Sequence, residues 1–147
     1  MTKESMMTRF LALALAVLAI LGSARSEPIT ATLYKNPQCG CCEEYAKYLR
    51  QNGFIVAVKP THNMSLISRQ NGVPEKLAGC HTMLIGGYVV EGHVPVSAIN
   101  KLLAEHPAIK GISLPGMPEG SPGMTGTKTE PFTIYEISDE AKVFVVE

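Results

Sequence analysis

The spacing of hydrophobic residues changes several times along the chain, and each change marks the start of a new predicted element. "ITATLY" (29–34) and "FIVAVKP" (54–60) are β-rich runs and predict strands. Between them, residues 41–52 carry apolar side chains at i, i+3, i+4 and i+7, which predicts an amphipathic helix ended by Gly53. Pro37 favours a turn in "KNPQCG", directly before this helix.

The same pattern predicts three more elements. Residues 63–72 form a short helix capped by Asn63, and "TMLIGGYVVEG" (82–92) forms a hairpin that turns at its two central glycines. A further helix lies within residues 95–106, because Pro95 suits a helix start and its apolar positions share one face. The order βαβαββα, with cysteines at the first strand-to-helix turn, predicts an α/β protein with a thioredoxin-like fold.

The C-terminal part of the chain has a different pattern. Residues 111–130 are dense in Pro and Gly, carry Met117 and Met124, and lack any period, so we expect an extended loop. Residues 131–147 contain two β-rich runs and predict a closing β-hairpin. Because a long loop inside a compact domain is more often functional than idle, we expect the loop to take part in the site.

The N-terminal 26 residues read as a targeting signal. A weakly basic start is followed by the apolar run 10–21 and by small residues suited to cleavage after Ala24 or Ser26. This apolar run is well short of the roughly 20 residues that a spanning helix needs. We therefore expect a signal peptide over 1–26, export to the periplasm, no stable membrane span after cleavage, and a single domain over 27–147.

Composition excludes one class of partner. Without the signal peptide, the chain keeps ten Lys and Arg against twelve Asp and Glu, a net charge of about −2. The chain lacks the excess of Lys and Arg that is typical of nucleic-acid-binding proteins, so we expect no nucleic-acid partner.

All four cysteines follow the predicted signal peptide, and three of them crowd into "CGCC". Cys39 and Cys42 have the C-x-x-C spacing of a thiol redox pair at a helix start. Cys42 falls on the apolar face of the predicted helix, whereas Cys39 precedes it. The pattern therefore predicts Cys39 as the accessible sulfur and Cys42 as the sheltered one.

Two features next to this pair indicate a metal site. Cys41 adds a third thiol, while Glu43 and Glu44 add negative charge that would weaken thiol activation. Thiolate and thioether ligands select Cu(I), zinc or iron–sulfur clusters. Structural zinc sites usually show two separated cysteine pairs, which C-x-C-C matches poorly.

Further candidate ligands lie farther along the chain. Cys80 and His81 precede a predicted strand, in the loop that faces the cysteine turn in a glutaredoxin-like fold, so Cys80 should approach the other three sulfurs. Four sulfurs can bridge more than one Cu(I). His93, before the last predicted helix, and the loop residues Met117 and Met124 are additional candidate ligands.

Several segments together resemble the CopG-type periplasmic copper resistance proteins, a thioredoxin-like metal-binding family. These segments are the signal peptide, "LYKNPQCGCCEEYAKYLRQNGF", the Cys80–His81 pair, "EGHVPVSAINKLL" and "PGMPEGSPGM". The resemblance implies a Gram-negative periplasmic protein of copper handling. It also implies Cys39, Cys41, Cys42 and Cys80 as copper ligands, and a role in interconverting Cu(I) and Cu(II).

The sequence leaves three functional hypotheses. The first is a copper-binding redox protein that holds Cu(I) through the four cysteines, as a multinuclear cluster, with a disulfide between Cys39 and Cys42 as the switch. The second is a thiol-disulfide oxidoreductase acting on proteins, and the third is a copper chaperone or store. The expected partners are copper ions and periplasmic copper-handling or electron-transfer proteins.

Overall fold

The fold is built on one mixed sheet. The computed structural model describes residues 27–147, so the predicted signal peptide over 1–26 lies outside the described residues. The elements in chain order are β1 (Thr30–Lys35), α2 (Gly40–Gln51), β2 (Ile55–Pro60), α3 (Met64–Gln70), the 3₁₀ helix η1 (Glu75–Leu77), β3 (His81–Ile85), β4 (Tyr88–Gly92), α4 (Val96–Glu105), β5 (Gly111–Leu114), β6 (Thr133–Glu136) and β7 (Val143–Val146).

The seven strands lie in the order β2-β1-β3-β4-β5-β6-β7. β1 pairs with β2 and β4 pairs with β5 in parallel, while the remaining neighbours are antiparallel. The α/β class, the order βαβαββα and the C-terminal hairpin of β6 and β7 are therefore confirmed. The closer likeness to thioredoxin stays a prediction.

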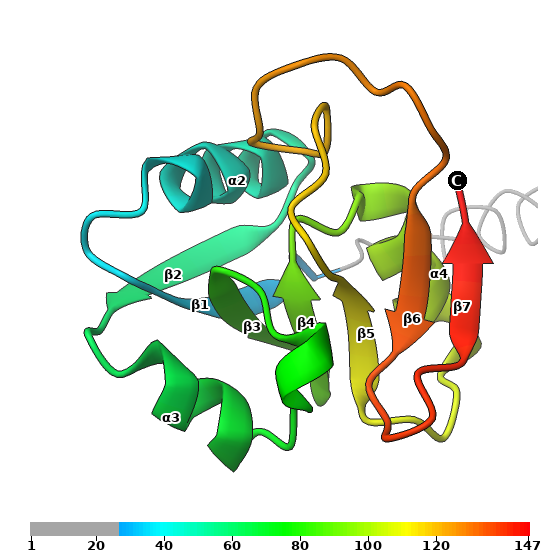
Figure 1. Cartoon of the computed structure of the whole chain (residues 1–147). Helices are drawn as coiled ribbons and strands as arrows, with labels where there is room; N and C mark the ends of the chain where they lie inside the picture. Colours follow the sequence, from blue (N-terminus) through cyan, green and yellow to red (C-terminus); the bar gives the residue numbers. More distant parts are fainter. Residues whose placement is uncertain (1–26) are drawn as a thin grey trace, which may run out of the picture.

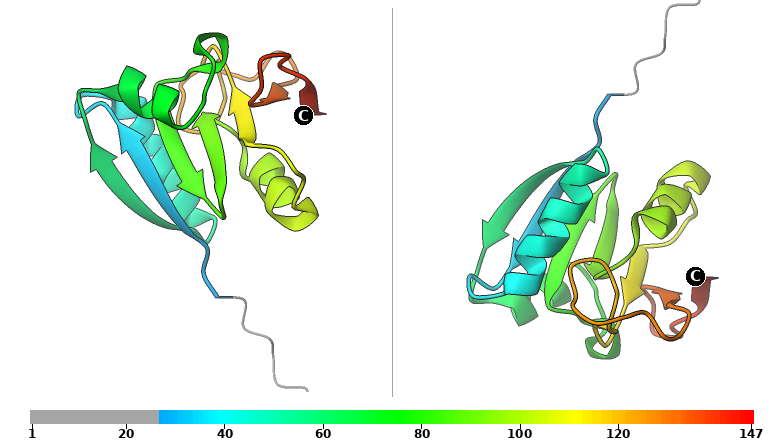
Figure 2. Two further views of the ribbon diagram at one scale, coloured as in Figure 1. Left: turned by 90° about the horizontal axis from the view of Figure 1, so that it is seen from below. Right: turned by 90° about the horizontal axis from the view of Figure 1, so that it is seen from above.

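Helices cover both faces of the sheet, with α2 and α3 on opposite sides (Figures 1 and 2). The main core lies between the sheet and the face that carries α2 and α4, where Leu33, Leu49 and Ile99 are fully buried. A smaller cluster around Leu77 and Val89 packs on the other face. Alternation along β4 explains the division, because Val89 and its neighbour Val90 point to opposite faces.

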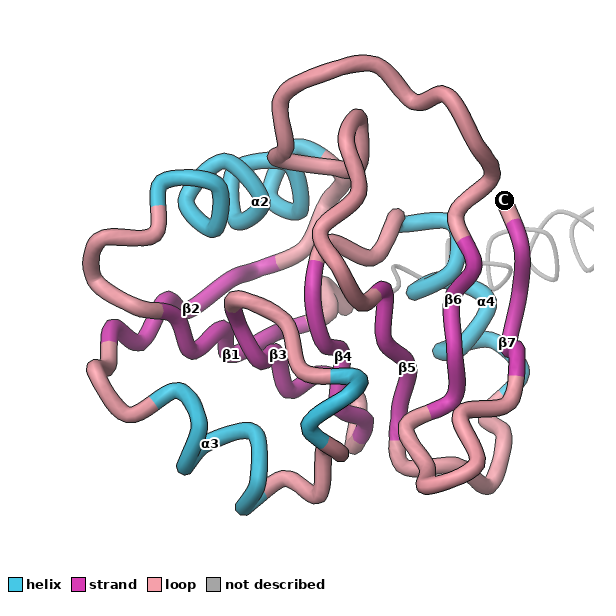
Figure 3. The backbone as a smooth tube through the Cα atoms, viewed as in Figure 1, coloured by secondary structure: helices cyan, strands magenta, loops and turns pink. Residues whose placement is uncertain are grey.

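The expectation of a loop over 111–130 was wrong for its first four residues, which form β5 beside β4. Gly111 makes this pairing possible, because a Cβ at this position would lie 1.8 Å from the carbonyl oxygen of Val89. The remaining residues, 115–132, leave the sheet, reach α2 and return to β6 (Figure 3). The expectation of a loop before β3 was wrong for His81, which is the first residue of that strand.

Within residues 27–147, no helix combines the length and the apolar character that a membrane crossing requires.

Candidate metal centre

The cysteine turn joins the end of β1 to the start of α2. The backbone N–H of Cys39 donates to the carbonyl oxygen of Asn36, and the N–H of Gln38 donates to the Asn36 side chain, so the turn is closed locally. Cys39 and Cys42 form a disulfide. Cys42 is fully buried and Cys39 is half-buried, which agrees with the predicted difference in access.

The other two cysteines, Cys41 and Cys80, are free thiols next to this disulfide. Cys41 Sγ lies 3.4 Å from Cys39 Sγ, and Cys80 Sγ lies 3.5 Å from Cys42 Sγ. The four sulfur atoms all lie within 4.8 Å of one another. The structure thus brings Cys80 to the cysteine turn across 38 residues of sequence.

Two histidines extend this cluster on the Cys80 side. Cys80 Sγ lies 3.1 Å from His93 Nε2 and 3.5 Å from His81 Nδ1. His93 Nδ1–H donates to the carbonyl oxygen of Pro122 at 2.6 Å, because a carbonyl can only accept. This bond leaves the Nε2 lone pair directed at Cys80, the arrangement that metal-binding histidines use.

Burial favours the uncharged forms of the titratable groups at the centre of the cluster. It lowers the pKa of His81 to about 3, with a smaller contribution from neighbouring His93, and it lowers the pKa of His93 as well. Burial, and next the neighbouring Cys41, raise the pKa of the Cys80 thiol to about 12. Because the ligands of a soft metal are neutral imidazoles and thiolates, a metal that binds here would displace the Cys80 proton.

An aromatic side chain orients the histidines. The ring of Tyr45 stacks on His81 with centroids 4.6 Å apart and meets the edge of His93 at 5.2 Å. Its hydroxyl donates to the carbonyl oxygen of Val94 at 2.8 Å. Tyr45 is fully buried on the apolar face of α2, one helical turn after Cys42. The helix that presents the cysteines therefore also fixes the imidazoles.

The donor atoms fall into two overlapping groups. One contains the four cysteines, and the other contains Cys42, Cys80, His81 and His93, with the ligand atoms of each group within 4.8 Å of one another. Sulfur and imidazole donors at such distances fit copper or zinc, so the residues present are chemically suited to a soft metal. Cys42 and Cys80 belong to both groups.

The loop after β5 touches the same site. Besides the bond from His93 to Pro122, Gly123 packs so closely on α2 that a Cβ would lie 2.8 Å from the carbonyl oxygen of Cys41. The candidate ligand Met124 follows Gly123 and is half-buried, whereas the other candidate, Met117, is 39% exposed with a positive φ of 47°. The loop therefore contacts the site. In the sequence, Met124 lies closer than Met117 to the two contacting residues, Pro122 and Gly123.

Two buried charged residues beside the site were missed by sequence reasoning. Lys35 is 1% exposed and pairs with Glu43 at 2.6 Å, so the negative charge assigned to Glu43 is matched by a cation. Glu91 is fully buried, and its carboxylate accepts the N–H of Gly79 at 2.8 Å. The alternation of Ala31, Leu33 and Lys35 along β1 was a signal that Lys35 points inward.

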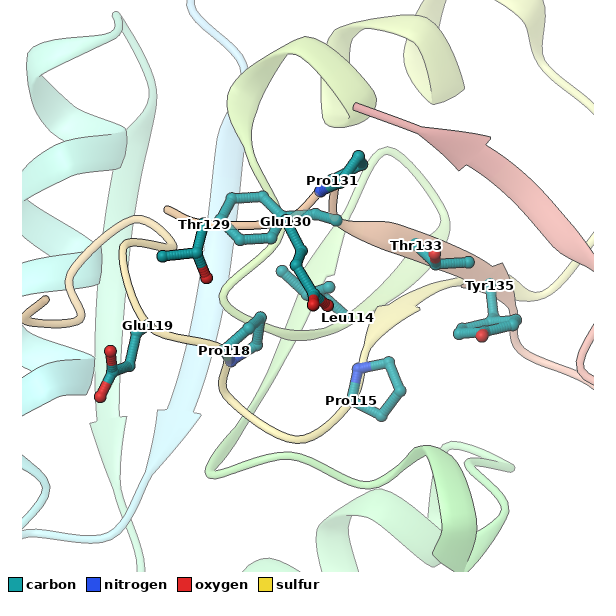
Figure 4. Close-up of a pocket in the computed structure, with 10 residues that line it drawn as sticks. Leu114, Pro115, Pro118, Glu119, Thr129, Glu130, Pro131, Thr133 and Tyr135 are labelled. Atoms are coloured by element: carbon teal, nitrogen blue, oxygen red, sulfur yellow. The ribbon is translucent and has the colours of Figure 1, made fainter. Parts of the chain in front are cut away.

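A cavity of about 480 Å³ opens between the loop and the strands β5 and β6. Figure 4 shows the carboxylate of Glu130 above Leu114 and Pro118, with Glu119 at one side. The residues that line this cavity include none of the cysteines or histidines. It is therefore separate from the metal centre, although the same loop forms both.

Comparisons with known proteins place this geometry in a family. A family model described as "Protein of unknown function, DUF411" matches residues 77–124, which include Cys80, His93 and Met124. The chain is 36% identical to the solved structure "Copper resistance protein copG- Form 1", covering 82% of this chain and 98% of that chain with a TM-score of 0.74. The chain belongs to the CopG family of copper resistance proteins.

A second CopG structure, "Copper resistance protein copG- Form 2", matches with the same identity, 96% coverage of that chain and a TM-score of 0.72. No curated protein matches this chain. The resemblance read from the sequence is confirmed, and CopG membership together with the cysteine cluster supports a copper-related function.

Proposed function

We propose that this protein binds Cu(I) for copper resistance, as a multinuclear cluster bridged by Cys39, Cys41, Cys42 and Cys80. The observation that carries the proposal is the convergence of four sulfur atoms within 4.8 Å of one another. Bridging sulfur can serve two copper ions at once, and soft sulfur ligands select Cu(I). The name of the related structures, copper resistance protein, favours copper over zinc.

The additional ligands extend the cluster toward the loop. His93 offers Nε2 and His81 offers Nδ1 toward Cys80, and both imidazoles are neutral at physiological pH because burial lowers their pKa values. We include Met117 and Met124 as thioether ligands from the loop, since Gly123 and Pro122 hold this segment against the site.

The disulfide supplies the redox half of the proposal. Two Cu(II) ions each take one electron from the Cys39 and Cys42 thiols, which lose two protons and join as the disulfide, and two Cu(I) ions result. A reductant of the thiol class regenerates the dithiol. Metal and disulfide compete for the same sulfurs, so copper occupancy and redox state are linked.

The alternative of a thiol-disulfide oxidoreductase on proteins rests on one observation. The disulfide is formed, and its outer sulfur, Cys39, is half-buried while Cys42 is sheltered. This alternative expects insulin reduction that survives Cys41→Ser and Cys80→Ser. A third possibility, a copper chaperone or store, expects transfer of copper without a change in oxidation state.

The predicted signal peptide supports a proposal about where the protein acts. We propose export to the periplasm after removal of residues 1–26, where copper-handling or electron-transfer proteins are the partners. N-terminal sequencing of protein from the periplasmic fraction tests this proposal, and an N-terminus upstream of residue 25 contradicts it.

Anaerobic titration of the reduced protein with Cu(I), against a competing chelator, tests the function. We expect more than one tightly bound copper per chain, and loss of the cluster in Cys80→Ser. His62→Gln changes an exposed histidine and serves as the matched control. One copper or none per chain in the reduced native protein contradicts the cluster, and retention of full stoichiometry in Cys80→Ser excludes Cys80 from it.

A further inference from the structure

Lys35, the last residue of β1, places a buried cation directly before the cysteine turn. Its side chain is 1% exposed, and its ammonium lies 2.6 Å from Glu43 Oε1. The ammonium also donates to the carbonyl oxygen of Pro37 at 3.4 Å. Pro37 comes two residues before Cys39, and Glu43 directly follows Cys42. Lys35 therefore links the entry of the cysteine turn to the first turn of α2.

Stability alone does not explain a lysine at this position. Ala31 and Leu33 occupy the preceding inward positions of β1, so an apolar residue would continue the pattern. A buried ammonium costs free energy unless it is paired, and replacing a buried ion pair by apolar residues is often neutral or stabilising. What Lys35 adds that an apolar residue cannot is a positive charge beside Pro37 and Glu43, which flank the cysteine turn.

The charge of Lys35 is screened by solvent less than the charges on the exposed face of α2. Its ammonium is buried, so solvent screens it little, whereas the partner carboxylate of Glu43 belongs to a side chain that is 54% exposed. The next ion pair along the helix joins Glu44 and Lys47 at 3.5 Å, with both side chains more than 60% exposed. Water screens that second pair, which is worth little at the sulfurs.

We propose that Lys35 is a positioning residue whose charge sets the reduction potential of the Cys39–Cys42 pair. A thiol of the reduced pair can lose its proton and become a thiolate, whereas the disulfide carries no charge, so a nearby cation favours the reduced pair and a nearby carboxylate opposes it. Lys35 thus favours the dithiol, and Glu43 moderates this effect. The inference concerns the disulfide alone and holds for the protein without copper.

Equilibration of the copper-free protein with reduced and oxidised glutathione tests the proposal. Reduction breaks the Cys39–Cys42 bond, while two glutathione thiols give up two electrons and two protons and join as one disulfide. The fraction of Cys39–Cys42 disulfide is measured by alkylation of free thiols and mass spectrometry of the peptide that contains the turn. Lys35→Met, Glu43→Gln and the double variant are compared with the native protein.

We expect Lys35→Met to lower the equilibrium constant for reduction by about threefold to tenfold, which is roughly 15–30 mV toward a more negative potential. Glu43→Gln keeps an acceptor for Lys35 but removes the carboxylate charge, so it should raise the constant by a similar factor. The double variant should return close to the native value, because both charges are gone.

The matched control is Glu44→Gln, which makes the same formal charge change one residue away at a screened position. It should shift the constant by less than about twofold. A loosened turn would move both single variants in the same direction, and this outcome overturns the proposal, as does an unchanged constant in either single variant. Since Glu43 is largely exposed, Glu43→Gln should fold normally and keeps the test decisive if Lys35→Met does not. The result is independent of copper binding, so the two proposals fail separately.

Discussion

Replacing Glu91 by Gln should remove a pH-dependent loss of stability. Glu91 is fully buried opposite Thr82 of β3, and burial raises the pKa of its carboxyl to about 7, although the N–H of Gly79 offsets part of this effect. In the unfolded chain the same carboxyl has its ordinary pKa of 4.5. Between these two values the folded protein holds a proton that the unfolded chain has released.

The sign and size of the effect follow from this difference. Since the folded state binds more protons between pH 4.5 and about 7, the free energy of unfolding falls as pH rises through this window and is level above it. A difference of roughly two and a half pKa units corresponds to about 3 kcal/mol. Glu91→Gln keeps an acceptor for the Gly79 N–H without a group that ionises, so this loss should disappear.

The assay is urea unfolding of the copper-free disulfide form of both proteins, from pH 5 to pH 8. The histidines act in the opposite direction, because the lowered pKa of His81 makes stability rise as pH increases from about 3 to 6.5. Both proteins share this contribution, so it cancels in the difference between them. We expect nearly equal stability at pH 5 and an advantage for Glu91→Gln of up to about 3 kcal/mol at pH 8.

An exposed glutamate provides the control for this series. Glu130→Gln makes the same chemical change at a solvent-exposed position, and its difference from the native protein should stay flat with pH. A flat difference for Glu91→Gln across the same range would refute the argument that Glu91 holds a proton in the folded state.

Three further predictions concern the site and its loop. His93→Gln should weaken Cu(I) binding by about tenfold in chelator competition, because it removes the ligand atom Nε2 and the hydrogen bond to Pro122. The control variant His62→Gln should bind Cu(I) as the native protein does. Equal affinities of His93→Gln and the native protein would show that His93 is not a ligand. Gly123→Ala should lower the free energy of unfolding by about 1–3 kcal/mol more than Gly116→Ala does. Both glycines have a φ of 82°, but only at Gly123 would the added Cβ meet backbone atoms of α2. Equal losses in the two variants would mean that the loop does not pack on α2. Tyr45→Phe should cost about 1–3 kcal/mol in urea unfolding by leaving the Val94 carbonyl unpaired, and an unchanged midpoint would contradict that role.

Local pattern was enough to predict the elements that carry the cysteines. The helical period of residues 41–52 placed Cys42 inward, and the predicted strand and hairpin order brought Cys80 to the cysteine turn. The first feature follows from the spacing of apolar positions, which is a local property of the chain, whereas the second depends on the fold that the order of elements predicts. The strand β5 could not be found in this way, because it is four residues long and exists only through pairing with β4.

The ion-pair partners of the charged residues near the site were harder to predict than the positions of the helices and strands. Sequence reasoning treated Glu43 and Glu44 alike, since they are neighbours in the first turn of a helix. The structure separates them, because Glu43 meets a buried lysine from β1 and Glu44 meets an exposed lysine on the same helix. Which cation a carboxylate meets depends on tertiary packing, and the inward position of Lys35 at the strand end decides it here.

The arrangement of donors also limits how the disulfide and a metal can coexist. The disulfide uses Cys39 and Cys42, and Cys42 belongs to both groups of donors. Closing it therefore weakens both groups together. It leaves Cys80 with two neutral imidazoles and with Cys41, whose sulfur lies within 4.8 Å of Cys80 Sγ. Because Cys42 is buried and Cys39 is half-buried, a reductant must reach the pair through Cys39. Access to Cys39 thus controls the sulfur that both groups of donors share.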